Sequence, residues 1–69
     1  MNIREKRRAH ILSRIIKTWR EIKSKGVEID EKDFAWQIAA EYGVTLRKAQ
    51  EYLRTGKILY EREERAKNG

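Results

Sequence analysis

Gly43 is the residue that most constrains how this chain folds. It lies within "IAAEYGVTLRKAQEYL", residues 38–53, between two stretches that each favour helix. A glycine inside a helix costs roughly 1 kcal/mol relative to alanine, so a chain forming one continuous helix here would avoid it. The segment therefore predicts a helix, a break and a second helix.

An apolar stripe predicts a long helix over residues 3–25. At about 100° per residue, the following residues fall on one side of it: Ile11, Leu12, Ile15, Ile16, Trp19 and Ile22. The basic residues of this segment lie largely outside the stripe, so we expect them on the solvent side. Gly26 is expected to end the helix.

The second helix is predicted over residues 31–42, capped by Asp30. The acidic residues around this start are read as capping groups and not as catalytic carboxylates. The inward side is expected to carry Phe34, Ala35, Ile38, Ala39 and Tyr42. Trp36 and Ala40 fall on the opposite side. They are our candidates, together with the C-terminal tail, for a dimer surface.

The third helix is predicted over residues 45–55, beginning after Thr45 as its N-cap and ending near Thr55 before Gly56. Its inward side is expected to carry Ala49, Tyr52 and Leu53, with Leu46 at the margin. For residues 57–69 two structures stay open: a short strand at 58–60 paired with 27–29, or a C-terminal helix. The predicted fold class is all-α, a single three-helix domain over residues 1–69.

Charge is distributed unevenly along the chain, which has a net charge of +6. Residues 1–25 carry nine Lys or Arg against two acids, and residues 45–57 carry four against one. Residues 26–44 are acidic. A polyanionic partner approached by the first and third segments is therefore expected.

The residues around Gly43 resemble the helix-turn-helix superfamily of DNA-binding proteins. In that family an alanine stands four residues before the turn glycine, where this chain has Ala39. The apolar positions of the pattern are filled by Ile38, Tyr42, Val44, Ala49 and Tyr52. The resemblance implies that the two helices cross steeply and that the third helix enters the major groove of double-stranded DNA.

Carried onto this chain, the resemblance implies two sets of contacts. The base-contacting positions are Thr45, Leu46, Arg47, Gln50 and Glu51. Arginine pairs with guanine, glutamine with adenine and glutamate with cytosine, so these residue types suit base reading. The expected contacts to the DNA backbone are Lys48, Arg54 and Lys57 of the third helix and Arg4, Arg7 and Arg8 of the first. The alternative is a solvated charged face, in which Glu51 pairs with Lys48 or Arg54.

Other function classes fit the sequence less well. His10 is the only histidine, and the glycines are isolated, so we expect neither an enzyme nor a small-molecule substrate. Without cysteine, zinc sites that need it are excluded, and no cofactor or metal is expected. The apolar side of the first helix is needed for the core, which argues against membrane binding.

We therefore expect a sequence-specific DNA-binding protein, a small transcriptional regulator that is cytoplasmic and nucleoid-associated. A homodimer is expected because one short recognition helix gives limited affinity. The competing interpretation is a helical protein-interaction module of a larger assembly.

Overall fold

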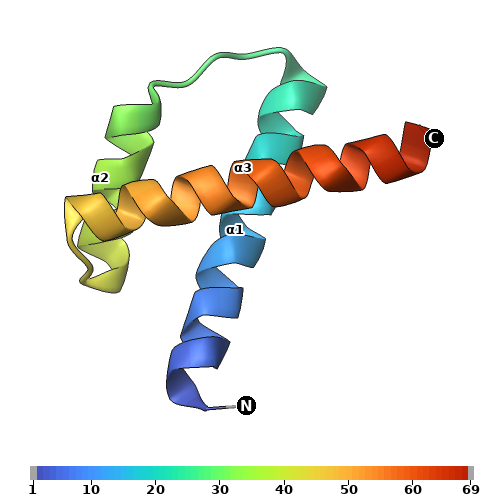
Figure 1. Ribbon diagram of the computed structural model, residues 1–69. Coiled ribbons are helices and arrows are strands. Elements are labelled where there is room, and N and C mark those ends of the chain that lie inside the picture. Colours follow the sequence, from blue (N-terminus) through green and yellow to red (C-terminus); the bar gives the residue numbers. More distant parts are fainter. Residues whose placement is uncertain (1, 69) are drawn as a thin grey trace.

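The computed structural model describes residues 2–68, which form three helices: α1 (Ile3–Lys25), α2 (Glu31–Tyr42) and α3 (Leu46–Asn68). Within this described part no strand occurs, so the predicted all-α, three-helix domain is confirmed. α1 and α2 run in roughly opposite directions, and α3 crosses in front of both and packs against each of them (Figure 1).

The helix ends follow the predicted capping residues. The Asp30 carboxylate accepts hydrogen bonds from the backbone N–H groups of Lys32 (2.9 Å) and Asp33 (3.3 Å), so the predicted cap of α2 is confirmed. Gly26 ends α1 in the left-handed conformation, with φ of 67°. These contacts satisfy donors and acceptors that a helix end leaves without partners.

The turn between α2 and α3 is built around Gly43, whose φ is 65°. The N–H groups of Gly43 and Val44 both donate to the Ala39 carbonyl oxygen. Thr45 then caps the start of α3, because its hydroxyl accepts a hydrogen bond from the Lys48 N–H at 3.1 Å. A left-handed residue at this point turns the chain sharply within three residues, so that α3 crosses α2, as the sequence predicts.

The hydrophobic core lies where α3 crosses the other two helices. Ile11, Ile15 and Ile38 are completely buried in it. The remaining members of the cluster are Phe34, Ala35, Ala39, Ala49 and Leu53. Small alanines on α2 and α3 allow the two helices to pack closely. The predicted inward faces are thus confirmed for all three helices.

The prediction that the third helix ends near Thr55 is wrong. α3 continues through Gly56 to Asn68, so the alternative strand pairing of 58–60 with 27–29 is also wrong. Gly56 is buried against Ile15, and a Cβ atom built on it would lie 2.5 Å from Ile15 Cγ2. The glycine therefore allows α1 and α3 to approach each other and does not terminate the helix.

The C-terminal half of α3 braces α1. Tyr60 is buried, and Arg20 forms an ion pair with Glu63 at 2.7 Å. Lys23 lies 3.4 Å from Glu64, and this hydrogen bond raises the pKa of Lys23. Exposed ion pairs contribute at most about 1 kcal/mol each, so Tyr60 and the Gly56 crossing hold this half mainly by packing.

Candidate nucleic-acid interface

The outer face of α3 carries residues that are predicted to contact DNA. Ala49 and Leu53 point inward, so residues about half a turn away from them on the helix point outward. Arg47, Gln50 and Arg54 are exposed, and the described residues provide no ion pair for either arginine. These three side chains are therefore available to a ligand.

Two predicted base-contacting residues are partly engaged within the domain. Leu46 is half-buried and packs against the core, so only part of its side chain is accessible. Thr45 is exposed, but its hydroxyl already accepts the capping hydrogen bond from Lys48. Thr45 can still donate its hydroxyl proton.

Glu51 and Lys48 form an exposed ion pair, with 3.7 Å between the carboxylate and the ammonium group. Lys48 also lies over the ring of Tyr52, 5.4 Å from its centroid. This ion pair is one of the two that are expected for Glu51 if the outer face of α3 is only a solvated charged surface. A pair this exposed is weak and exchanges readily with another partner.

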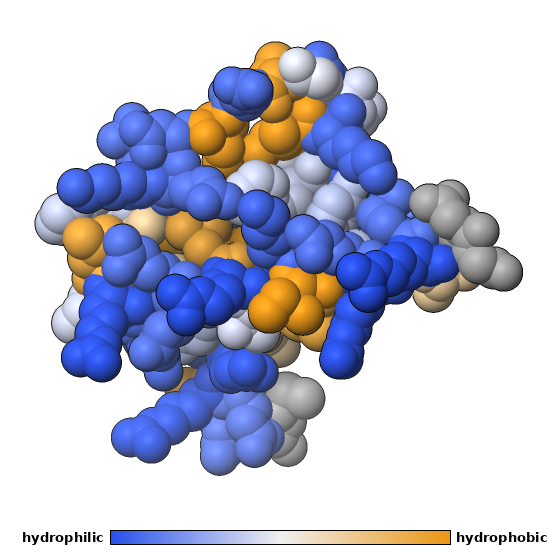
Figure 2. Space-filling view, turned by 45° about the horizontal axis from the view of Figure 1, so that its top comes forward, coloured by the Kyte–Doolittle hydropathy of each residue, from blue (hydrophilic) through white to orange (hydrophobic). Residues whose placement is uncertain are grey.

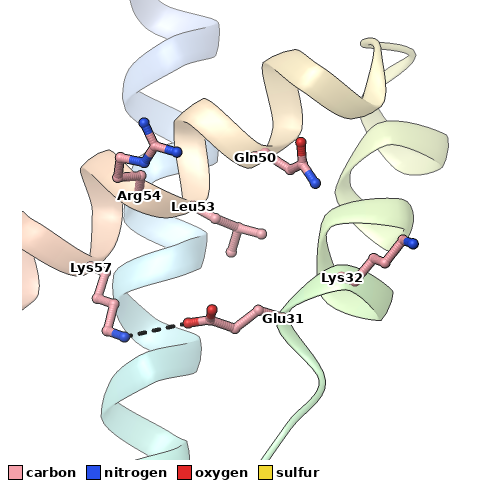
Figure 3. Close-up of a pocket in the computed structure, with 6 residues that line it drawn as sticks. All are labelled: Glu31, Lys32, Gln50, Leu53, Arg54 and Lys57. Carbon is pink, nitrogen blue, oxygen red and sulfur yellow. Dashed lines mark hydrogen bonds and ion pairs between the residues drawn. The ribbon is translucent and has the colours of Figure 1, made fainter.

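Lys57 lies beside a groove between the start of α2 and the middle of α3 (Figure 3). The groove has a volume of about 530 Å³ and is lined by Glu31, Lys32, Gln50, Leu53, Arg54 and Lys57. Lys57 Nζ lies 3.4 Å from Glu31 Oε1, which the dashed line in Figure 3 marks. Lys57 is predicted from the sequence to contact DNA, whereas nothing in the sequence indicates that Glu31 and Lys32 are its neighbours.

The N-terminal part of α1 forms a basic arm, residues 3–10, that extends past α3 (Figure 1). Every residue of this arm is exposed, and Ile3 is 85% exposed. Arg4 and Arg8 stand seven residues before Ile11 and Ile15, which places them on the same side of α1 as these core residues. Arg4 and Arg8 therefore lie within the arc of the apolar stripe, but both are exposed to solvent, as expected, because the core begins at Ile11.

Arg7 is on a different side of the arm. It precedes His10 and Arg14 by three and seven residues, so it shares the side of α1 that faces α2. The His10 ring contacts the Tyr42 ring edge-on at 5.8 Å, and Arg14 forms an ion pair with Glu41. Burial lowers the pKa of Arg14, but hydrogen bonds to Tyr42 and Glu41 outweigh it, so the net shift is upward.

Trp36 is the most exposed large apolar residue of α2, at 54%. Ala40 is exposed on the same side, as predicted. Figure 2 shows a mainly hydrophilic surface with separate hydrophobic patches. The tail, now the end of α3, lies at the far end of that helix from α2 (Figure 1). Trp36 and the tail are therefore two separate surfaces.

Within residues 2–68 no cluster of His, Cys, Asp and Glu is arranged to hold a metal ion. None of the three helices, over the part described, is long and apolar enough to cross a membrane. Comparison of the chain with protein-family models, curated proteins and solved structures finds no match.

Proposed function

We propose that this protein binds double-stranded DNA in a sequence-specific manner and acts as a small transcriptional regulator. The observation that carries the proposal is the outer face of α3, where Arg47, Gln50 and Arg54 are exposed directly after a tight turn. A helix with its side chains is about 10–12 Å wide, which suits the B-DNA major groove of about 12 Å.

In this proposal the start of α3 reads bases. Arg47 donates two hydrogen bonds to guanine, and Gln50 pairs with adenine. Glu51 leaves Lys48 to accept from the amino group of cytosine, which releases Lys48 for a phosphate. Thr45 and the accessible part of Leu46 contact bases at the N-terminal end of α3. Arg54 binds the DNA backbone.

The basic arm of α1 supplies further phosphate contacts. Arg4 and Arg8 share the side of α1 that faces α3, so they approach a duplex lying against α3. Arg7 reaches a phosphate on the α2 side of the arm. Phosphate contacts fix position and orientation without reading sequence.

The active form in this proposal is a homodimer. One recognition helix contacts few base pairs, and two-fold related helices read half-sites about 34–36 Å apart. The exposed face of α2 with Trp36 and Ala40 is the proposed dimer surface. A DNA-bound protein of this kind is nucleoid-associated in the cytoplasm.

One observation favours the alternative of a protein-interaction module. Ile58 is 49% exposed and stands one turn beyond Arg54 on the same face of α3. An apolar residue at the centre of a charged face is typical of protein interfaces. In the DNA-binding proposal Ile58 lies beyond the base-reading residues and contacts sugar or solvent.

The test is selection of binding sites from random duplexes at two ionic strengths. We expect an enriched motif, and for about five neutralised phosphates the slope of log affinity against log salt is about −4 to −5. Arg47→Ala is expected to cost roughly 1–3 kcal/mol on the selected site and to relax one position of the motif. Arg65→Ala, on the distal part of α3, is the matched control. A protein that enriches no motif and binds duplexes with no salt dependence is not a DNA-reading protein.

A further inference from the structure

The groove beside α3 holds more positive charge than its single acid balances. Lys32 lies on the α2 wall, and Arg54 and Lys57 lie on the α3 wall (Figure 3). Glu31 is the only carboxylate among the six lining residues. Leu53 forms the apolar floor between the two walls.

Lys57 is held in this groove by two weak contacts. Its ammonium group lies 3.4 Å from the Glu31 carboxylate and 5.5 Å from the centroid of the Trp19 ring. The side chains of Lys57 and Glu31 are 51% and 59% exposed. Solvent screens a pair this exposed, so a stronger anion at the same place can displace Glu31.

We infer that the groove binds one phosphate group of the DNA backbone, and that Glu31 competes with this phosphate for Lys57. The inference rests on the proposed function, because the groove shares Gln50 and Arg54 with the proposed reading face. A phosphate has several acceptor oxygens and can take Lys57 from Glu31, which pairs with Lys57 alone, while Lys32 and Arg54 on the two walls add positive charge around the groove.

This arrangement makes Glu31 a residue that weakens DNA binding. Glu31→Gln removes the competing charge and is expected to tighten duplex binding about two- to fivefold. Lys57→Gln is expected to weaken it about three- to tenfold and to reduce the magnitude of the salt slope by about 0.9. A residue whose removal improves binding separates this inference from general loss of positive charge.

Matched controls lie at the other end of α3. Lys67 and Glu63 form an exposed ion pair at 3.7 Å; at 1.5 Å per residue they stand about 15 Å and about 9 Å along the helix axis from Lys57. Lys67→Gln and Glu63→Gln therefore make the same charge changes outside the groove, and Glu63→Gln additionally removes the partner of Arg20. Circular dichroism of each variant establishes that it is folded before its affinity is compared.

Trp19 reports the position of Lys57 directly. In a Trp36→Phe background, whose sedimentation is first matched to wild type because Trp36 belongs to the proposed dimer surface, Trp19 is the only tryptophan, and the Lys57 ammonium group over its ring influences its emission. Binding of a duplex is expected to draw Lys57 from the ring and shift the emission. Adding Lys57→Gln to this background is expected to abolish most of the shift.

The experiment measures duplex affinity of the four variants and titrates the Trp36→Phe protein with duplex DNA and, separately, with inorganic phosphate. Tighter binding by Glu31→Gln, with both distal controls near wild type, supports the inference. Equal affinities for wild type, Glu31→Gln and Lys57→Gln overturn it while leaving DNA binding intact. A Lys57-dependent shift with inorganic phosphate at the same phosphate concentration assigns the groove to a free anion and overturns the backbone assignment. If wild type fails to bind any duplex at low salt, the proposed function and this inference both fail.

Discussion

Replacing Gly56 by alanine is expected to destabilise the protein, although alanine is the better helix former. Gly56 lies in the interior of α3, where alanine gains about 1 kcal/mol over glycine in helix propensity. The new Cβ atom, however, would lie 2.5 Å from Ile15 Cγ2 and 3.1 Å from Ile15 Cβ. Both atoms belong to the stiff, β-branched base of the side chain, which cannot rotate away.

The two effects have opposite signs, and the clash is the larger. Overpacking a buried contact costs typically about 1–3 kcal/mol, and a 2.5 Å contact in the centre of a crossing belongs to the upper part of that range. After subtraction of the helix gain, Gly56→Ala should lower the free energy of unfolding by roughly 1–2 kcal/mol. For a domain of this size each kcal/mol lowers Tm by about 4–8 °C.

The assay is urea denaturation followed by circular dichroism, in wild type and in an Ile15→Leu background. Leucine conserves the volume of isoleucine, usually at a cost below about 1.5 kcal/mol, but carries no branch at Cβ. The Cγ2 clash therefore disappears, and Gly56→Ala should become neutral or stabilising in that background. If Gly56→Ala stabilises the wild-type protein by about 1 kcal/mol, α1 and α3 do not approach closely at this point, and the reasoning is refuted.

Three further changes test other parts of the structure. Ala39→Leu adds bulk at the crossing of α2 and α3 and should destabilise the fold by roughly 1–3 kcal/mol, and an unchanged melting temperature would argue against the tight turn. Trp36→Ala should shift the oligomer equilibrium towards monomer in sedimentation, and identical sedimentation would remove Trp36 from the dimer surface. The raised pKa of Lys23 means that its pairing with Glu64 stabilises the fold fully below the ordinary pKa of 10.5 and is lost as the pH rises through the raised value. Lys23→Met should therefore lose less stability than wild type above pH 10.5, and an equal loss would contradict the pairing.

Local patterns explain why much of the fold was predictable. The bounds of α1 and α2, the cap at Asp30 and the turn at Gly43 depend on residues close together in the sequence. The prediction that the third helix ends before Gly56 is wrong because glycine has two common roles near helices. It can end a helix, or it can allow two helices to approach closely. Only Ile15, 41 positions earlier in the sequence, distinguishes them.

Some features of the candidate site were likewise predictable from local sequence patterns, and others were not. The exposure of Arg47 and Arg54 follows from helical spacing alone and was predictable. The ion pair of Lys57 with Glu31 was not, because it joins residues 26 positions apart and exists only where α3 crosses beside α2. Glu31 stands at the start of α2, as the sequence predicts, and also pairs with Lys57 of α3.

The helix crossing at Gly56 also positions Lys57, one of the residues that line the groove. Lys57 follows Gly56 directly, and its ammonium group lies over Trp19, one turn beyond Ile15 on α1. The distance between α1 and α3 at Gly56 therefore sets where Lys57 stands relative to Trp19. A change that separates the two helices there moves Lys57 away from Trp19 as well as reducing stability. In a folded Gly56→Ala sample the emission of Trp19 should consequently resemble that of Lys57→Gln, whereas wild-type emission in this variant would show that the two features are independent.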